Sequence, residues 1–256
     1  MLSKAELKRL RAIKSRKGRA ESGLFVAEGI RLVEDLLTTD IVLQQALLAP
    51  SLEDNPRGAA LARALRARVR TIEVSEHELD RVAGTETPQG VLVIAEIPRP
   101  RLRDITLPQR ALVLVLDGVQ DPGNFGTVVR SADAFGVACV LTLPGTVDPW
   151  NPKSVRAAMG ASLRVPIVDV TVPAAIEWLR TSRCRILGAD AAGVSVEEIG
   201  VAARTALVLG NEGAGLSDAI RTAVDDLVGV PIRGTVDSLN VGVAAGILLY
   251  LLTRGK

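Results

Sequence analysis

The stretch Ala111–Arg130, ALVLVLDGVQDPGNFGTVVR, combines an apolar segment, a glycine-containing loop and the start of a helix. Ala111–Leu116 is apolar throughout, which is typical of a strand buried on both faces of a parallel sheet. The loop Asp117–Gly123 follows, and Asn124 can cap a helix whose apolar face begins at Phe125. A strand, a loop and a helix in this order predict an α/β domain.

The same alternation continues toward the C-terminus and predicts a mainly parallel sheet. Further strands are expected at 137–143, 165–168, 184–189, 205–209 and 227–230, and helices at 153–162, 173–181, after Ser217 and at 240–252. Two more loops follow strands, contain glycine and lead into helices, Leu209–Ser217 and Val230–Val241. Ligands of parallel α/β domains bind beyond the carboxyl ends of the strands, so the three loops form the candidate site.

The N-terminal part predicts a smaller α/β domain over residues 1–97. A helix is expected at 3–16, with Lys17-Gly18-Arg19 ending it, and short strands and helices alternate up to residue 95. Pro98 and Pro100 remove backbone donors and favour extended chain. We therefore expect a linker at 98–108 and the larger domain at 109–256.

Composition excludes several classes of protein. With one histidine, His77, and two cysteines, Cys139 and Cys184, the 256-residue chain offers neither a disulfide framework nor a Cys/His metal cage, so no metal is expected. Reduced thiols and the lack of an apolar stretch after Met1 favour a cytoplasmic protein without a secretory signal. The longest apolar run, Val241–Leu252, is shorter than the about 20 residues of a membrane span, so it predicts a buried helix and no membrane partner.

Basic residues are concentrated at the N-terminus. Residues 1–20 hold eight basic residues and one acidic residue, a net charge of +7, whereas the other 236 residues hold 23 basic and 28 acidic residues, a net charge of −5. A basic segment on a slightly acidic body favours a polyanionic partner, and the alternative is a solvated helix face. The candidate contacts are Lys14, Arg16, Lys17 and Arg19.

The loop residues also have purely structural interpretations. A single glycine loop can be a tight turn, and Gly210–Gly215 lacks the G-x-G-x-x-G spacing of dinucleotide-binding loops. The chain contains no G-x-x-x-x-G-K-[ST] phosphate-binding loop. Asn124 can be only a helix cap, and Ser238 and Asn240 can share the capping of the last helix.

Arg130 and Glu212 are less easily explained by structure alone. Arg130 points away from the apolar stripe of its helix, and its structural alternative is a surface ion pair with Asp133, which contributes little. Glu212 lies between glycines directly after an apolar strand, an unusual place for a carboxylate that is merely solvated.

Together the three loops resemble the SpoU/TrmH branch of the SPOUT RNA methyltransferases. The motifs that carry the resemblance are Asn124…Arg130, Gly210-Asn211-Glu212-Gly213 and Pro231…Ser238-Leu239-Asn240-Val241, in that order within residues 111–254. The N-terminal part resembles the L30e-like substrate-binding domain of the same family, in Lys14…Lys17-Gly18-Arg19…Gly23–Gly29 and Thr87-Pro88-Gln89-Gly90-Val91.

This resemblance implies a fold, a methyl donor and a reaction. The fold would be a SPOUT domain with a trefoil knot, a feature that general rules of chain topology would not predict. The donor would be S-adenosylmethionine, held by the backbone of Gly210, Val230, Ile232 and Leu239. The reaction would be methylation of a ribose 2′-hydroxyl in structured RNA by a homodimer. The catalytic residues would be Arg130, Asn124, Glu212, Ser238 and Asn240.

Roles for these residues follow from their chemistry. Arginine stays protonated, so we expect Arg130 to grip a phosphate with its two-pronged guanidinium rather than to act as a general base. The other four would orient Arg130 and the ribose, or hold the loops. We also expect Gly210→Val to block the donor while leaving the fold largely intact.

Three alternatives remain beside methylation of large-subunit ribosomal RNA. The same chemistry on transfer RNA is one, although the separate N-terminal domain favours ribosomal RNA. A non-catalytic RNA-binding protein is disfavoured because every expected polar position is filled. An oxidoreductase with a nucleotide cofactor is disfavoured because its phosphate-binding fingerprint is missing.

Overall fold

The computed structural model describes residues 2–85, 87–200 and 202–254, and it divides into two compact units. The first unit comprises Met1–Pro98 and Asp148–Leu163, and the second comprises Arg99–Val147 and Arg164–Lys256. The division after Pro98 falls at the start of the expected linker. The sequence does not predict that residues 148–163 belong to the first unit.

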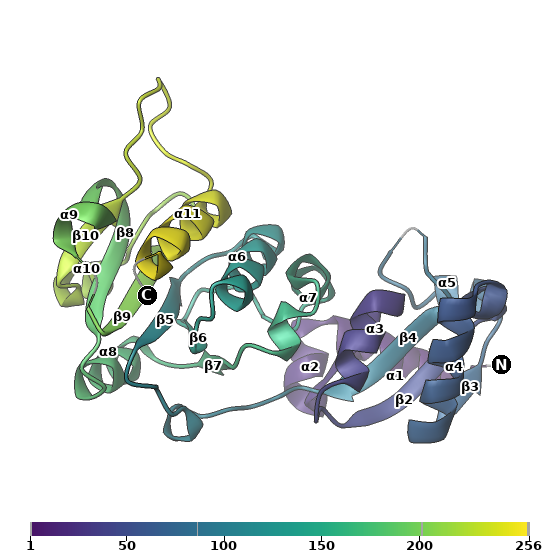
Figure 1. Ribbon diagram of the computed structural model, residues 1–256. Coiled ribbons are helices and arrows are strands. Elements are labelled where there is room, and N and C mark those ends of the chain that lie inside the picture. The colour runs from purple at the N-terminus through teal and green to yellow at the C-terminus, as the bar shows by residue number, and fades with distance from the viewer. Residues whose placement is uncertain (1, 86, 201, 255–256) are drawn as a thin grey trace. The chain divides into compact units, whose positions relative to one another are not determined.

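A parallel sheet forms the centre of the second unit (Figure 1). Its strands lie in the order β10-β8-β9-β5-β6-β7, and every neighbouring pair is parallel. The strands are β5 (Ala111–Asp117), β6 (Cys139–Thr142), β7 (Ile167–Asp169), β8 (Arg185–Ser195), β9 (Arg204–Gly210) and β10 (Asp226–Gly229). All seven residues of β5 are buried, as expected for a strand covered on both faces. The predicted α/β class with a mainly parallel sheet is confirmed.

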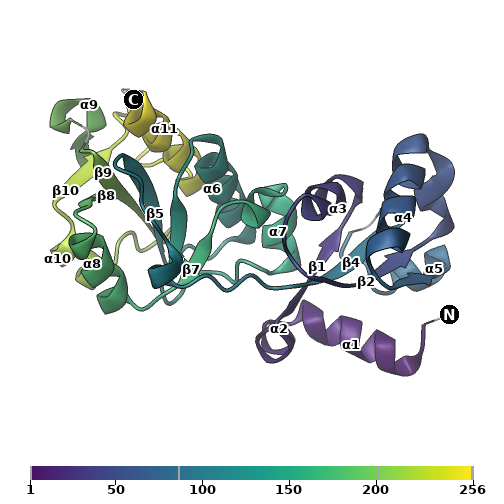
Figure 2. The same cartoon turned by 60° about the horizontal axis from the view of Figure 1, so that its bottom comes forward.

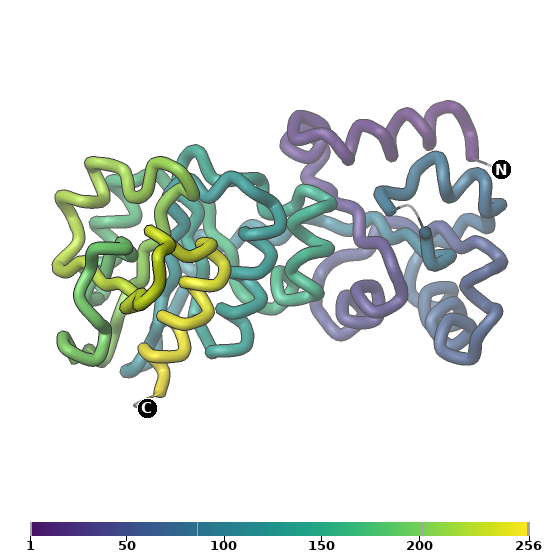
Figure 3. Tube along the Cα trace, turned by 90° about the horizontal axis from the view of Figure 1, so that it is seen from above, coloured from purple at the N-terminus to yellow at the C-terminus, as the bar shows by residue number. Residues whose placement is uncertain are grey.

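Helices cover both faces of this sheet. They are α6 (Pro122–Ala134), α8 (Val172–Thr181), α9 (Val196–Ile199), α10 (Asp218–Ala223) and α11 (Val241–Thr253), with a 3₁₀ turn, η2, at Leu102–Asp104. Figure 2 shows α6 and α11 on one side of the sheet and α8 and α10 on the other. The last helix is the yellow coil of the Cα trace in Figure 3.

The two glycines of α11 allow α6 to pack closely against it. A Cβ on Gly242 would lie 3.1 Å from Cγ2 of Thr127, and one on Gly246 would lie 3.6 Å from Oγ of Ser131. The contact at Gly242 is therefore tight, whereas the one at Gly246 is an ordinary van der Waals contact. One stripe of α11 nevertheless remains open, because Val243 is 52% exposed and Tyr250 is 50% exposed.

The first unit has a mixed sheet in the order β1-β4-β2-β3. The strands are β1 (Leu24–Glu28), β2 (Leu43–Leu48), β3 (Thr71–Glu73) and β4 (Val91–Glu96). β4 pairs antiparallel with β1 and β2, and β2 pairs parallel with β3. Phe25 and Ala27 of β1 contribute to one apolar core, while Leu24 and Val26 contribute to the core on the opposite face.

The helices of the first unit are α1 (Lys4–Lys14), α2 (Arg16–Ser22), α3 (Ile30–Leu37), α4 (Pro56–Arg68), α5 (Glu76–Asp80) and α7 (Pro152–Ala158), with 3₁₀ turns η1 (Pro50–Asp54) and η3 (Ala161–Leu163). The expected single helix at 3–16 is wrong in one respect: the chain breaks at Ser15, and Lys17-Gly18-Arg19 lies inside α2. Ser15 closes α1 and accepts a hydrogen bond from the Gly18 amide. A Cβ on Gly18 would lie 2.0 Å from the Ala12 carbonyl oxygen, so glycine is required for this close contact.

Across the described part of the chain, none of the helices is long and apolar enough to cross a membrane.

Candidate functional site

Glu212 connects the loop after β9 to the start of α6. Its Oε2 accepts a hydrogen bond from the Gln120 amide at 3.1 Å. Its Oε1 accepts from the Asp121 amide at 3.1 Å and from Nδ2 of Asn124 at 3.0 Å. The carboxylate therefore accepts from two amides of the loop after β5 and from one side chain in the first turn of α6.

Asn124 is free to make this contact because it is not the helix cap. Asp121 caps α6 and accepts a hydrogen bond from the Asn124 amide at 2.8 Å. Asn124 lies inside the first turn, where its side-chain amide can bridge two neighbours. The capping interpretation of Asn124 is wrong for this reason.

Asn240 completes a chain of hydrogen bonds across the three loops. Its Nδ2 donates to Oδ1 of Asn124 at 2.9 Å. Its Oδ1 caps α11 and accepts from the amides of Gly242 at 2.9 Å and Val243 at 3.4 Å. Glu212, Asn124 and Asn240, which lie far apart in sequence, are thus joined directly.

Hydrogen bonding keeps Glu212 ionised. Partial burial raises the pKa of this carboxyl, but the hydrogen bonds from Asn124 and from the Gln120 and Asp121 amides outweigh it. The net pKa lies below the ordinary value, so Glu212 is a fixed acceptor at neutral pH. An acceptor whose lone pairs are engaged in this way holds loops together rather than taking up protons.

A cavity of about 580 Å³ opens beside this chain, beyond the carboxyl ends of β9 and β10. Its walls include all four predicted donor contacts, Gly210, Val230, Ile232 and Leu239, together with Asn124, Glu212, Ser238 and Asn240. The volume is within the range of small-molecule sites, which is about 300–1,000 Å³. The wall combines apolar side chains with polar groups that converge from separate loops.

Asn211 shapes the loop that follows Gly210, a role that sequence reasoning missed. Its backbone exchanges two hydrogen bonds with Gly215, at 2.9 and 3.0 Å. Its Oδ1 accepts from the Gly213 and Ala214 amides, both at 2.9 Å, while its Nδ2 donates to the Gly118 carbonyl at 2.8 Å. An asparagine followed by glycines was the available signal, because its side chain readily bonds the backbone two or three residues on.

Gly210 itself packs against this turn. A Cβ at Gly210 would lie 2.3 Å from the Gly215 carbonyl carbon and 2.5 Å from the Leu216 amide nitrogen. A valine there would therefore displace the turn. The expectation that Gly210→Val leaves the fold intact is wrong.

Asp190 is a second wall residue that sequence reasoning missed. It accepts a hydrogen bond from the Ala192 amide at 3.0 Å and forms an ion pair with Arg221 at 2.6 Å. The amide bond and the Arg221 guanidinium lower the pKa of Asp190. Gly193 of β8 and Gly229 of β10 let the two strands approach closely here, and a glycine within a strand was the available signal.

Arg130 and Ser238 are exposed at the surface of the second unit. Arg130 lies on α6 away from its buried residues, among them Phe125, Val128 and Ala132. Asp133, which the structural interpretation required as partner, accepts hydrogen bonds from Arg164 at 2.8 and 3.0 Å. Ser238 lines the cavity, but Asn240 alone provides the side-chain cap of α11.

The four basic residues predicted to contact RNA have different environments. Arg16 and Lys17 are exposed, whereas Lys14 is half-buried and donates to the Ala83 carbonyl at 2.6 Å. Arg19 is only 3% exposed and pairs with Asp148 at 2.6 Å. The prediction of an RNA contact by Arg19 is therefore corrected, because its charge is buried and neutralised within the first unit.

Comparison with known proteins identifies the family. The SpoU rRNA methylase family matches residues 111–250, and the MRM3-like substrate binding domain matches residues 4–93. The chain belongs to the SpoU/TrmH methyltransferases of the SPOUT superfamily, which confirms the predicted resemblance.

Three relatives illustrate how far the similarity extends. A 23S rRNA (guanosine(2553)-2′-O)-methyltransferase of Bacillus subtilis strain 168 is 33% identical over 96% of this chain and 95% of its own. The SpoU methyltransferase AviRb of Streptomyces viridochromogenes, solved with AdoMet, has a TM-score of 0.91 and 29% identity, covering 99% of this chain and 98% of that one. An AdoMet-bound rRNA methyltransferase of Sinorhizobium meliloti has a TM-score of 0.89 and 31% identity, covering 100% and 97%.

Proposed function

We propose that the protein transfers the methyl group of S-adenosylmethionine to a ribose 2′-hydroxyl of large-subunit ribosomal RNA. The observation that carries this proposal is the hydrogen-bonded chain Glu212–Asn124–Asn240 at the rim of the 580 Å³ cavity. A relative that spans nearly the whole chain is a 23S rRNA 2′-O-methyltransferase, and this supports the substrate class. The bound AdoMet of two structural relatives supports the donor.

The cavity suits S-adenosylmethionine in size and in chemistry. Leu209, Val230, Ile232 and Leu248 supply apolar wall for an adenine ring. The ionised Glu212 at the same wall favours a cationic ligand. When bound, S-adenosylmethionine would supply a methyl group on a positively charged sulfur. The neutral thioether that remains after the transfer is a good leaving group.

Arg130 is the residue that we assign to substrate positioning. A ribose hydroxyl is a weak nucleophile and must be held in line with the methyl group while it loses its proton. A guanidinium can bind a neighbouring phosphate through two parallel hydrogen bonds and stabilise the developing negative charge on the oxygen. The proton leaves to that phosphate or to water.

Asn124, Glu212 and Asn240 would keep the three loops in the geometry that this alignment requires. Ser238 presents a hydroxyl at the cavity wall, where it could bond the ribose. Lys14, Arg16 and Lys17 of the first unit would contact RNA phosphates, which predicts salt-dependent binding. The L30e-like domain would recognise the shape of the folded RNA.

The exposed apolar stripe on α11 supports a homodimer. Val243 and Tyr250 lie seven residues apart, which places them on one face of the helix. Tyr250 contacts Phe135, the residue that ends α6, with tilted rings whose centroids lie 6.2 Å apart. An isologous dimer would bury this stripe against its own copy.

A ribosomal RNA substrate and two buried free thiols support a location in the cytoplasm.

The direct test is methyl transfer to RNA transcripts that carry no modification. Purified protein would be incubated with radiolabelled donor and either 23S rRNA or a pool of transfer RNAs, and the products digested to nucleosides. We expect labelled 2′-O-methylnucleosides from 23S rRNA only. Label in transfer RNA alone would show that transfer RNA is the substrate instead of ribosomal RNA. Label on a base would contradict the proposed transfer to a ribose hydroxyl.

A further inference from the structure

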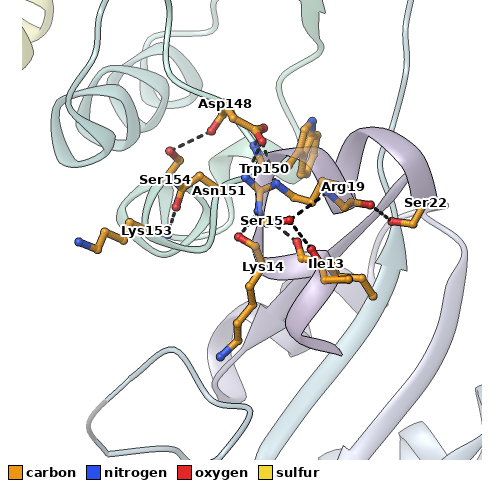
Figure 4. A network of polar contacts seen from close by, with 12 residues as sticks. Ile13, Lys14, Ser15, Arg19, Ser22, Asp148, Trp150, Asn151, Lys153 and Ser154 are labelled. Carbon is orange, nitrogen blue, oxygen red and sulfur yellow. Dashed lines mark hydrogen bonds and ion pairs between the residues drawn. The ribbon is translucent and has the colours of Figure 1, made fainter. Parts of the chain in front are cut away.

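The segment 148–163 is built into the first unit by a buried ion pair. The Arg19 guanidinium donates to Oδ2 of Asp148 at 2.6 and 2.8 Å, and to the carbonyls of Ile13 and Lys14 at 3.1 and 2.6 Å. Figure 4 shows this guanidinium held between Asp148 and the end of α1. Asp148 in turn accepts from the Trp150 amide at 2.9 Å.

Apolar contacts fix the same segment to β1. The rings of Trp150 and Phe25 lie 4.7 Å apart, and Trp150 and Val155 belong to the core formed with α3 and α4. The position of α7 relative to α1 and β1 is therefore well defined within the unit. As a result, side chains from residues 148–163 face the predicted RNA-binding segment.

Arg156 of α7 lies over the loop that follows α5. A Cβ on Gly84 would be 2.8 Å from its Nη1. Arg156 is half-buried, and within residues 2–85, 87–200 and 202–254 its side chain has no hydrogen bond or ion pair. Lys14 approaches the same loop from α1 and donates to the Ala83 carbonyl at 2.6 Å.

The charges around this loop are unbalanced. Burial lowers the pKa of Lys14, and the charges of Arg156 and Arg11 lower it further, while Glu28 raises it. Glu28 is the nearby carboxylate, but it already accepts from the Gly84 amide at 2.7 Å and from the Thr85 hydroxyl. Lys14 and Arg156 therefore lie near the same loop, while the nearby Glu28 carboxylate is hydrogen-bonded to Gly84 and Thr85.

We infer that Arg156 and Lys14 form a phosphate-binding site for the backbone of structured RNA, completed by a segment that lies far from the N-terminus in sequence. This inference rests on the proposed function. Arg156 supplies a planar fork that can bind two phosphate oxygens, and Lys14 supplies a point charge beside it. A bound phosphate would relieve the repulsion between the two cations.

The test is binding of the full-length protein to a 23S rRNA fragment across a series of salt concentrations. Arg156→Gln should weaken binding several-fold at about 0.1 M salt and reduce the salt slope by about one. Arg156→Lys should recover part of the affinity. The matched control is Arg63→Gln, because Arg63 on α4 is exposed and its side chain also has no hydrogen bond or ion pair among the described residues.

Three readouts separate this site from the proposed function. Donor affinity by calorimetry should match the unsubstituted protein in Arg156→Gln, because the residue does not line the donor cavity. If the unsubstituted protein methylates rRNA but Arg156→Gln binds it as Arg63→Gln does, the phosphate site is wrong. If the unsubstituted protein binds rRNA through Arg156 but methylates none, the site stands and the proposed function fails.

Discussion

Glu212 acts in this structure as the acceptor that holds the loop after β5 against the loop after β9. Glu212→Gln keeps one side-chain oxygen as an acceptor but replaces the other with an NH2 group. That group is a donor, so it cannot accept a hydrogen bond from the backbone N–H that it faces. We expect a loss of stability of about 1 kcal/mol or less, because the group is exposed. The single-turnover rate of methyl transfer should fall about 10-fold to 100-fold, because the site geometry loosens.

The stability effect should depend on pH in a defined direction. Folding lowers the pKa of Glu212 below its ordinary value of 4.5. Its contribution is therefore present above about pH 4.5 and is lost as the pH falls through the lower folded-state pKa. Urea unfolding at pH 7 and pH 3.5 checks this. A stability difference between the two proteins that grows toward acid would contradict it.

Sequence motifs identified the site residues, but not how each one acts. Three ordered loops were enough to predict that Asn124, Glu212 and Asn240 come together. Asp121 is the cap instead of Asn124, because the helix begins three residues earlier than predicted. Arg19 has the same charge as its exposed neighbours, and the carboxylate that neutralises it when buried comes from the distant Asp148. Such long-range pairs leave no local pattern in the sequence.

At the level of elements, the turn after β9 depends on the absence of a side chain at Gly210. Gly210→Ala should disrupt the turn, because its Cβ would lie 2.3 Å from the Gly215 backbone. We expect a loss of about 1–3 kcal/mol from overpacking and weaker donor binding. Gly234→Ala is the control, since a Cβ there meets nothing within 4 Å. Calorimetry measures the donor affinity of both variants, and thermal unfolding measures their stability. Equal donor affinity in the two would contradict the role of Gly210 in shaping the turn.

The exposed stripe of α11 gives a prediction for the oligomeric state. The unsubstituted protein should sediment as a dimer at micromolar concentration, and Val243→Asp with Tyr250→Glu should be a monomer, because charges cannot be buried unpaired at the interface. Val42→Asp is a matched control, as Val42 is also 52% exposed. A monomeric unsubstituted protein would contradict the dimer.

Most elements were predictable because periodicity and caps agree locally. Ser75, for example, caps α5 as expected: its hydroxyl accepts from the Glu78 amide, and the Glu78 carboxylate accepts from the Ser75 amide. The break between α1 and α2 was not predictable from periodicity, because Leu10 and Ile13 continue one apolar face up to it. It depends on Ser15 and on a contact that only glycine at position 18 allows.

At the scale of the whole molecule, the first unit is discontinuous in sequence. Its core includes Trp150 and Val155, which follow β6 of the other unit. The sequence suggests a single domain boundary because the prolines at 98 and 100 are a strong local signal. The inclusion of residues 148–163 in the first unit depends on packing, which leaves no such signal. The trefoil knot implied by the family resemblance stays a prediction.

A fragment of residues 1–98 should therefore be less stable than one in which 148–163 is joined to it through a glycine-serine linker. The shorter fragment exposes the core surface that Trp150 covers and removes the Asp148 partner of Arg19. Urea unfolding followed by circular dichroism measures both. Equal midpoints would show that the segment contributes nothing to the unit.

The central claim is that this chain positions a ribose hydroxyl for methyl transfer through Arg130. Single-turnover transfer with saturating rRNA and donor tests it most directly, in the unsubstituted protein, Arg130→Ala and Arg130→Lys. We predict rates lower by about 10²-fold or more in Arg130→Ala, little rescue in Arg130→Lys, and unchanged donor affinity. A rate equal to that of the unsubstituted protein in Arg130→Ala would contradict the claim.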